Sequence, residues 1–265
     1  MAPRPFWKGY LKLSLVTCPV AMMPAVSESA KVRFHTLNRA TGNRVQSVYV
    51  DAETEERVDE EDEARAYERG DDDYIVIEDE DLDAVALDST RTIDIERFVP
   101  ADSIGWIWYD RAHYLTPDDP VGEEAFSVIR DAMAATGTVA ISRLVLYRRE
   151  RAVMLVPRDR GIVLWTLRYG DEVRDAAAYF SDLGKEQVDG ALVKLVGRLI
   201  EERTVDWDPK MVEDPVQEKM LEIIAAKRKG RKPPKPAKPL PDGGGKVVSI
   251  MDALKRSLAE EKRKR

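Results

Sequence analysis

The chain has 265 residues, 43% of them hydrophobic, and a single cysteine, Cys18. This length is enough to bury a real core, and one cysteine excludes an internal disulfide framework and any cysteine-rich metal site. The first residues, MAPRPFWKGY, lack the apolar run of a signal peptide, and no apolar run approaches the roughly 18 residues that span a membrane. We therefore expect a cytoplasmic protein that does not associate with membranes.

The net charge of −7 conceals a strong segregation of charge along the chain. Residues 51–83 carry 18 acidic and 3 basic side chains, whereas residues 227–265 carry 14 basic and 4 acidic ones. Salt screens charges that lie more than about 8 Å apart at physiological ionic strength, so local charge governs what each surface attracts. The negative total therefore does not exclude a polyanionic partner.

Residues 6–16, FWKGYLKLSLV, alternate in the manner of a first strand. The odd-numbered positions from Trp7 to Leu15 share one face, and the opposite face carries Phe6, Lys8, Tyr10, Lys12 and Ser14. Lysines interleaved with aromatic rings can lie on a phosphate backbone, although an ordinary half-exposed strand has the same pattern. Pro19 and Pro24 are expected to end regular pairing.

Residues 51–73 are dominated by aspartate and glutamate and have few apolar anchors, which predicts an exposed excursion rather than core. The acids lack the spacing of a calcium-binding loop, but a nuclease that uses paired carboxylates with a metal ion stays an alternative. The only histidines, His35 and His113, are too far apart in sequence to suggest metal-ligand spacing, and we assign neither a chemical role.

The middle of the chain is predicted to be mostly β-structure with one helix. Short apolar segments predict strands at 74–77 and 92–99, a helical turn at 79–83, and a strand pair, Trp106–Tyr109 with His113–Thr116. Residues 123–135 form a helix in which Phe126, Ile129 and Met133 share one face, and Gly137 follows its end.

Residues 138–174 predict a β-meander with three apolar runs, 139–146, 152–156 and 162–167. The expected turns are Arg148–Arg151 and Pro157–Gly161, because proline and glycine interrupt a regular ladder. Eight arginines face four acids in this segment, so the sheet has a positive rim that suits an anionic ligand. Alternatively, these arginines only solvate a sheet edge and prevent strand-to-strand association.

The last third of the chain changes to helical periodicity. Residues 185–203 and 215–228 each present an apolar stripe, and the first includes Leu192, Leu195, Leu199 and Ile200. Residues 230–246 have the proline, lysine and glycine content of an extended linker, and a short basic helix after Val247 is marginal without a partner.

Taken together and in order, these stretches resemble one family, the bacterial Ku proteins, which bind DNA ends in prokaryotic non-homologous end joining. The resemblance runs from Phe6 to Lys229, and Trp207-Asp208-Pro209 stands where the family has Phe-Asp-Pro. The other matching stretches are Trp7–Leu11 with Leu15-Val16 and Pro19-Val20; Arg33–Leu37; Thr92–Ile95 with Phe98-Val99; Tyr114-Leu115 with Pro117; Val139–Ile141; Arg158-Asp159; and Leu167–Tyr169 with Glu172–Arg174.

The resemblance implies a fold that is mainly β with α: a Ku-type β-barrel core with a bridging arm and a C-terminal helical arm. The implied divisions are residues 1–180 for the core, with the DNA-encircling arm at about 43–74, residues 181–229 for helical dimerisation, and residues 230–265 for a basic linker and tail. It also implies a ring-shaped homodimer on double-stranded DNA ends at the bacterial nucleoid. The protein would recruit ATP-dependent DNA ligase D and need no catalytic residue, metal or cofactor.

Carried over position by position, the resemblance implies two sets of contact residues. The DNA-binding set is Lys8, Lys12, Arg39, Arg44, Arg148, Arg149, Arg151 and Arg174. The dimer interface is Leu192, Leu195, Leu199 and Ile200.

Three departures from the family pattern accompany these assignments. Ser14 stands where many members have glycine, and the arm has no Cys-x-x-Cys, so we expect no zinc in it. The acidity of the arm is unusual, and we expect its carboxylates on the outer surface of the ring. Besides the nuclease, a general nucleic-acid scaffold that binds through the basic tail stays an alternative.

Overall fold

The computed structural model describes residues 4–70, 73–85, 91–184 and 188–231, and the chain divides into two compact units. The first contains the residues up to Ala30 together with His35–Asp175. The second contains Lys31–Phe34 together with the chain from Ala176 onward.

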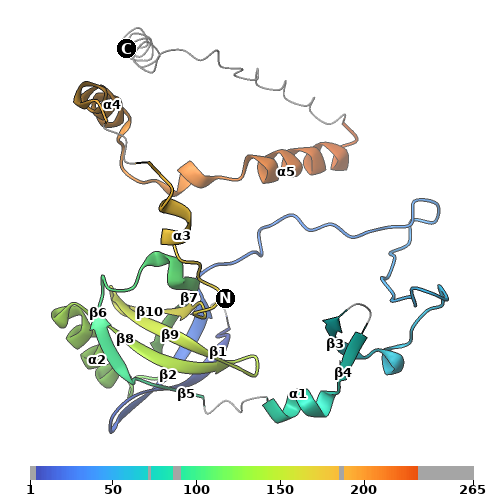
Figure 1. The fold of residues 1–265 in the computed structure, drawn as a ribbon, viewed down its shortest axis with the longest axis horizontal. Helices are drawn as coiled ribbons and strands as arrows, with labels where there is room; N and C mark the ends of the chain where they lie inside the picture. Colours follow the sequence, from blue (N-terminus) through green and yellow to red (C-terminus); the bar gives the residue numbers. More distant parts are fainter. Residues whose placement is uncertain (1–3, 71–72, 86–90, 185–187, 232–265) are drawn as a thin grey trace. The chain divides into compact units, whose positions relative to one another are not determined.

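An eight-stranded sheet in the order β5-β1-β2-β7-β10-β9-β8-β6 forms the body of the first unit (Figure 1). Strands β1 and β5 pair in parallel, and the other neighbours pair antiparallel. The strands are β1 (Trp7–Leu13), β2 (Val16–Pro24), β5 (Thr92–Asp94), β6 (Arg97–Pro100), β7 (Tyr109–Pro117), β8 (Thr138–Leu146), β9 (Arg149–Arg158) and β10 (Gly161–Leu167).

The sheet curls so that its two edges meet, because the edge strands β5 and β6 are consecutive in the chain. At this junction the Glu96 N–H donates to the Ile141 carbonyl over 3.1 Å, and the Ser142 hydroxyl donates to the Asp94 carbonyl. Residues at the first edge of the sheet are thereby bonded to β8, next to the last strand. The expected fold class, mainly β with a barrel core and several helices, is confirmed.

The core lies inside this curled sheet and under the helix α2 (Glu123–Thr136). Leu11, Leu155 and Leu164 are fully buried, and Phe126, Ile129 and Met133 join them from α2, as the sequence predicted. Burying a side chain such as phenylalanine contributes about 1.5–3 kcal/mol. Gly137, with φ +64°, ends the helix in the left-handed conformation that glycine adopts most readily.

The first predicted strand is shorter than expected. It ends at Leu13 because Ser14 turns the chain with φ +56°, and Leu15, expected on the buried face, is 97% exposed. Glycine is the residue that adopts this left-handed conformation most readily. Ser14 adopts the same conformation without the freedom of glycine.

Pro19 does not end pairing, contrary to the prediction. It lies within β2 opposite Tyr10, whose N–H is bonded to the Arg91 carbonyl on the other side of β1. The carbonyl of Pro19 accepts the Asp118 N–H over 3.1 Å. The missing N–H of proline is therefore not needed at this position of the ladder. Pro24, in contrast, is the last paired residue of β2, opposite His113, so the prediction that it ends pairing is confirmed.

The predicted strand pair at 106–116 is wrong. Trp106–Trp108 form a 3₁₀ turn, η2, and a single strand, β7, runs through Asp110 and Arg111. The sheet absorbs the irregularity as a bulge between Trp165 and Leu167 of β10, where the Thr166 hydroxyl accepts the Arg111 N–H over 3.1 Å. Asp110 and Arg111 therefore lie opposite a β-bulge in β10 and do not form a turn. The segment 92–99, expected as one strand, likewise divides into β5 and β6.

The predicted meander is confirmed as β8, β9 and β10, but its turns are tighter than expected. The first turn consists of Tyr147 and Arg148, with φ +52° and +62°, so Arg149 and Arg151 lie on β9. The second turns at Asp159 and Arg160, and Pro157 stays in the ladder opposite Ile162.

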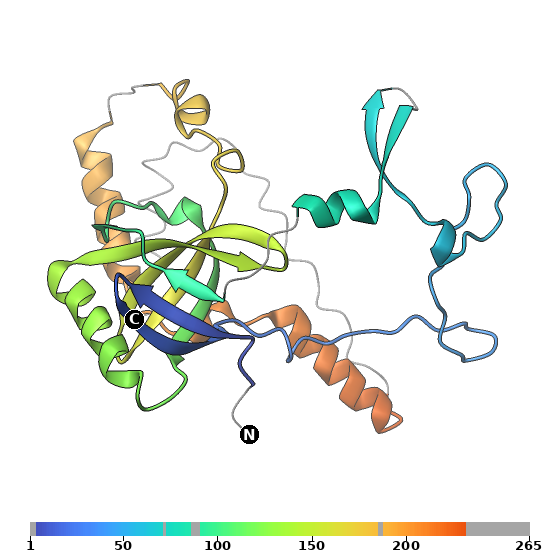
Figure 2. The ribbon, with the colours of Figure 1, turned by 90° about the horizontal axis from the view of Figure 1, so that it is seen from below.

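Between β2 and β5 the chain makes the predicted exposed excursion, and residues 35–85 of it are called the arm below. It contains two isolated bridges, the 3₁₀ turn η1 (Glu60–Asp62), the hairpin β3 (Arg65–Gly70) with β4 (Asp73–Ile77), and the helix α1 (Asp79–Val85). Figure 2 shows this segment, in blue to cyan, as largely extended chain. Every residue from His35 to Arg57 is exposed, so the arm has no core of its own there.

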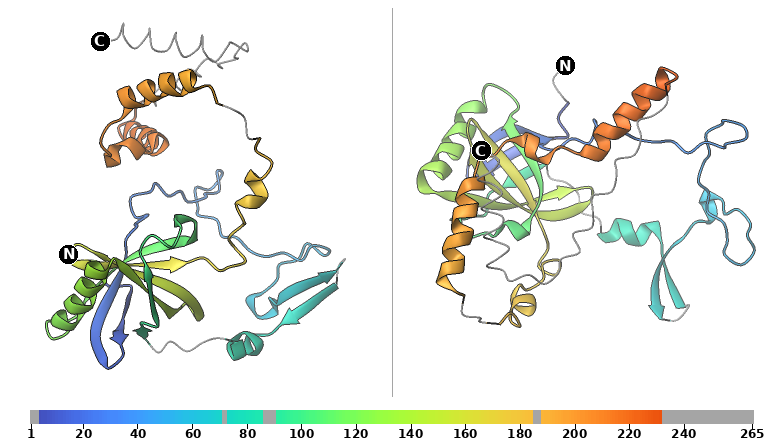
Figure 3. Two further views of the ribbon diagram at one scale, coloured as in Figure 1. Left: turned by 60° about the vertical axis from the view of Figure 1, so that its left-hand side comes forward. Right: turned by 90° about the horizontal axis from the view of Figure 1, so that it is seen from above.

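The second unit contains α3 (Ala177–Phe180), α4 (Gly190–Arg203), the 3₁₀ turn η3 (Pro209–Val212) and α5 (Pro215–Arg228), drawn in yellow to orange in Figure 3. Asp189 and Asp214 cap the N-termini of α4 and α5, and the Asp214 carboxylate accepts the N–H groups of Val216 and Gln217. Both predicted helices are present, and the second has the predicted bounds, but the first begins at Gly190 and not at residue 185, so Val188 lies before it. The predicted linker from Lys232 and the tail helix lie outside the described residues.

No residue of α4 or α5 is buried. Over the described ranges, no helix is both long enough and apolar enough to cross a membrane.

Candidate nucleic-acid interface

Lys8 and Lys12 lie on the outer face of β1, on either side of Tyr10, as the alternation predicted. Each ammonium group contacts a carboxylate from a distant part of the chain: Lys8 Nζ lies 2.7 Å from Asp118, and Lys12 Nζ lies 2.6 Å from Asp94. Such partly exposed pairs contribute about 0–1 kcal/mol. A phosphate oxygen could therefore replace either carboxylate at little cost.

The three arginines of the β8–β9 hairpin have different surroundings. Arg148, in the turn, pairs with Asp83 of α1. Arg149 is exposed and makes no ion pair within the described parts of the chain. The guanidinium carbon of Arg151 lies 5.8 Å from the centre of the Tyr169 ring, a cation–π distance. The structure brings these three side chains to one hairpin, but not to one turn.

Arg39 and Arg44 lie in the arm and are exposed. The Arg44 guanidinium donates to Nδ1 of His35 over 2.9 Å, which requires the imidazole to be an acceptor at that nitrogen. Leu37 and Arg44 form an isolated bridge, so the two arginines sit in and beside a small loop. Arg174 is exposed and follows β10 near the end of the first unit.

Arg143, which was not among the predicted contacts, lies on the outer face of β8. Its guanidinium lies 2.7 Å from Glu150 and 4.0 Å from Glu96, and the hydrogen bond that it donates to the Glu150 carboxylate raises the pKa of Arg143. The alternation of residues 139–146 already placed this side chain outward. Nothing in the sequence indicated that β5–β6 and β9 would supply its two carboxylate partners.

Several acids of the arm contact the arm's own cations and backbone. Asp79 pairs with Arg65, Asp73 pairs with Arg69, and the Asp51 carboxylate accepts the N–H groups of Thr54 and Glu53. Those backbone hydrogen bonds, from Thr54 first, lower the pKa of Asp51. Within the residues that the structure describes, no group of three or more histidine, cysteine, aspartate or glutamate side chains is arranged to hold a metal ion.

The predicted dimer residues lie on one stripe of α4. Leu192, Leu195 and Leu199 are partly exposed, and Ile200 is 61% exposed. The exposed apolar surface extends beyond the predicted stripe to Val193 and Val196. The helix therefore offers an apolar surface wider than the four residues that the sequence indicated.

Comparison with known proteins identifies the class of barrel that carries these cations. Residues 12–194 match the Ku70/Ku80 β-barrel domain family, and the chain belongs to the Ku family.

Several relatives match over almost their full length. The chain is 59% identical to the non-homologous end joining protein Ku of Methylocella silvestris, over 100% of this chain and 98% of that protein. It is 57% identical to the protein of the same name from Gluconacetobacter diazotrophicus, over 98% of this chain and 99% of that protein. The Bradyrhizobium protein of that name is 40% identical over 100% of this chain and 90% of its own length.

Proposed function

We propose that this protein binds the ends of double-stranded DNA, independently of sequence, in non-homologous end joining. The observation that carries the proposal is the near full-length similarity to relatives named for that process, the nearest of those described above being 59% identical. A protein with this role acts at the bacterial nucleoid.

The positions of the lysine and arginine side chains support DNA binding that does not depend on base sequence. Lys8 and Lys12 lie on an outward strand face, Arg148 and Arg149 on a hairpin, and Arg39 on an exposed loop. Lysine and arginine in such positions suit phosphate oxygens, which carry no sequence information directly. A protein that must accept any broken end gains from contacts that ignore the bases.

The exposed apolar side chains of the arm support a homodimer. Tyr49 is 70% exposed and Tyr67 is 66% exposed, and the hairpin that carries Tyr67 has only two strands. An isolated two-stranded hairpin is marginally stable in water at best. A second copy would cover these side chains, and two arms that meet across the DNA would close a ring around the duplex.

The C-terminal helices have the second role in this proposal. The stripe Leu192–Ile200 packs on the partner protomer, and the chain after Lys229 recruits ATP-dependent DNA ligase D. The ring needs no catalytic residue or cofactor, because topology, not chemistry, selects an end over a continuous duplex.

The test compares linear DNA with the same DNA as a sealed circle in a competition gel shift. A ring can load only from a terminus, so the linear competitor should displace a labelled linear duplex and the circle should not. Bulky hairpin adducts on both ends of the linear competitor should remove its advantage. Equal competition by sealed circles would falsify the proposal.

The same preparations separate the other two functions. Strand cutting that depends on magnesium and on the carboxylates of residues 51–83 would identify a nuclease. Removal of residues 230–265 should leave the end requirement intact, whereas a scaffold that binds through the tail would lose most of its DNA binding.

A further inference from the structure

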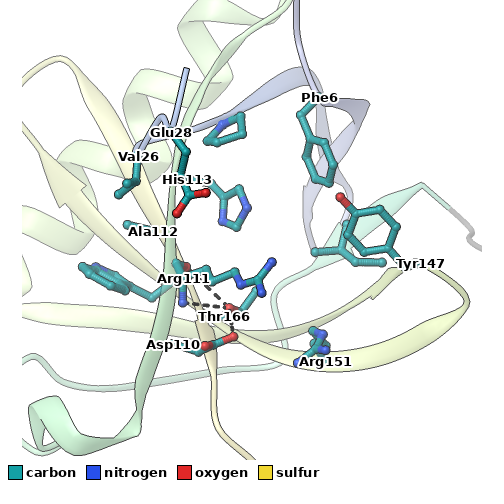
Figure 4. Close-up of a pocket in the computed structure, with 13 residues that line it drawn as sticks. Phe6, Val26, Glu28, Asp110, Arg111, Ala112, His113, Tyr147, Arg151 and Thr166 are labelled. Carbon is teal, nitrogen blue, oxygen red and sulfur yellow. Dashed lines mark hydrogen bonds between the residues drawn. The ribbon is translucent and has the colours of Figure 1, made fainter. Parts of the chain in front are cut away.

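A cavity of about 810 Å³ opens on the first unit, where the N-terminal residues meet β7, β10 and the β8–β9 hairpin (Figure 4). Its volume lies within the range of about 300–1,000 Å³ that is usual for sites of small organic ligands. The lining combines flat rings with charges of both signs, and the residues used below are Phe6, Asp110, Arg111, His113, Tyr147 and Arg151.

Aromatic rings form one wall of the cavity. The rings of Phe6 and His113 stack with their centres 5.9 Å apart and their planes 23° apart. The Tyr147 ring lies 5.6 Å from Phe6 at 51° and is 75% exposed at the opening. Tyr147 has a φ of +52°, a conformation that bulky residues rarely adopt, and the contact with Phe6 helps to keep its ring at the cavity.

His113 carries a hydrogen-bonding atom that has no partner among the described residues. Only 6% of the His113 residue is exposed, yet its Nδ1 makes no hydrogen bond with any described residue. Buried polar atoms are nearly always paired in folded proteins, but this nitrogen is covered by protein atoms, so His113 contributes to the cavity wall through its stacked ring and not through Nδ1. Figure 4 shows the imidazole between Phe6 and Arg111, on the cavity side of β7.

Charged groups surround the remainder of the opening. The Asp110 carboxylate accepts the Thr166 hydroxyl over 3.1 Å, and the same hydroxyl accepts the Arg111 N–H over 3.1 Å. These bonds fix the bulged segment of the sheet beneath the cavity. Arg111 and Arg151 add two guanidinium groups, which recognise phosphates and also stack on flat rings.

We propose that this cavity binds an unpaired nucleotide at a DNA end. The base stacks against the exposed Tyr147 ring beside the Phe6–His113 wall, and Arg111 and Arg151 contact its phosphate. Aromatic stacking accepts every base, which fits a protein that meets any broken end. This inference rests on the proposed function.

The position and charge of the cavity favour this occupant over an acidic peptide. Phe6 lies two residues from Lys8, and Tyr147 is adjacent to Arg148, so the opening adjoins two of the predicted phosphate contacts. Asp110 and Glu28 in the lining oppose an acidic peptide. A base edge has both donors and acceptors and can use carboxylates as well as guanidinium groups.

The test uses the full-length protein and linear duplexes with either flush ends or one unpaired nucleotide. Wild-type protein should prefer the unpaired end, and Tyr147→Ser should reduce that preference about tenfold, the scale of one lost base–aromatic stack. Tyr147→Phe should retain it. Trp106→Ser is the matched control, because Trp106 is equally solvent-exposed, at 79%, but lies outside the cavity.

A 5-iodouracil at the unpaired position should form a photochemical crosslink to Phe6, His113 or Tyr147, and the same base placed inside the duplex should not. An excess of free deoxynucleoside monophosphate should leave the crosslink in place, since the tethered end has the higher local concentration. Crosslinks elsewhere, or an unpaired-end preference that survives Tyr147→Ser, overturn the inference. A Tyr147→Ser variant that loses only ligase D binding overturns it in favour of a peptide.

The preference for linear over circular DNA is measured on the same variants. If it persists while the unpaired-end preference or the crosslink is absent, the cavity assignment fails and the end-binding function stands. If it is absent from the wild-type protein, the proposed function itself fails.

Discussion

The barrel and the arm belong to the same chain, but the barrel buries its apolar side chains and the arm leaves them exposed. In the barrel, Leu11, Leu155 and Leu164 are fully buried by their own neighbours. In the arm, Tyr49 and Tyr67 remain largely exposed. The barrel therefore buries its apolar side chains by itself, whereas the arm leaves apolar side chains exposed.

The largest expected effect tests whether the stability of the barrel depends on its own core and not on the arm. Phe126→Ala empties the fully buried position that α2 contributes to the core, and such substitutions cost about 3–5 kcal/mol. Tyr67→Ala in the arm hairpin removes an aromatic ring that is 66% exposed and should leave thermal unfolding of the barrel nearly unchanged. Differential scanning calorimetry of both variants measures the contrast. Equal losses would mean that the arm is part of the cooperative core.

The second expected effect concerns the surface of α4. Leu195→Asp with Leu199→Asp places two carboxylates on the apolar stripe, and each buried unpaired charge costs several kcal/mol, of order 3 or more. The variant should be monomeric in sedimentation velocity and should bind linear DNA weakly.

Lys194→Asp is the matched control for this pair. It changes the net charge by the same amount, but helical geometry puts residue 194 on the side opposite the stripe. It should remain dimeric. A dimeric Leu195→Asp, Leu199→Asp variant would place the interface elsewhere.

Two glycines provide the next contrast between the regions. A Cβ on Gly9 of β1 would lie 2.1 Å from the Arg91 carbonyl oxygen and 2.3 Å from the Trp7 ring. Gly9→Ala should therefore push β5 away from β1 and cost about 1–3 kcal/mol. Gly70→Ala in the arm hairpin meets nothing within 4 Å and should be neutral in the same thermal melt. If Gly9→Ala were as stable as the wild type, β5 could shift away from β1 without a measurable loss of stability.

The same contrast decides what could be predicted from the sequence. Alternation placed Lys8, Lys12 and Leu11 on the correct faces of β1, and helical periodicity placed Phe126 in the core, because local burial repeats along an element. The prediction for Pro19 was wrong because the sheet uses only the Pro19 carbonyl for pairing. Which of its groups are needed depends on the neighbouring strands β1 and β7, which the local sequence does not show.

Partners from distant parts of the chain account for the remaining differences. The turn at Tyr147 and Arg148 lacks the usual glycine or asparagine, so it was placed too late along the chain. The pairing of Lys8 with Asp118 joins residues 110 positions apart, which no local pattern records. The contact residues themselves stay predictions until DNA binding is measured.

Charge reversal on the β8–β9 hairpin tests whether the arginines of the barrel contact DNA. Arg148, Arg149 and Arg151 changed together to glutamate should weaken binding to all sequences by about tenfold or more and lower the salt slope by about 2–3. Fluorescence anisotropy over a salt series measures both.

Arg158 and Arg160 changed to glutamate are the control, because Arg158 ends β9 and Arg160 lies in the turn that follows, at the far end of β9 from Arg149. They should change binding less. If the triple variant kept the wild-type affinity and slope, the hairpin would be excluded as a contact.

The smallest expected effect concerns His113 in the barrel. Burial lowers the pKa of His113, an effect that the carbonyl groups of Arg111 and Leu164 oppose, so the unfolded chain takes up a proton at a pH where folded His113 does not. Stability should therefore fall as the pH drops below the ordinary value of 6.5. His113→Gln should flatten urea-unfolding stability between pH 7 and about 5.5 relative to wild type. If His113→Gln kept the wild-type slope, the pH dependence would belong to groups other than His113.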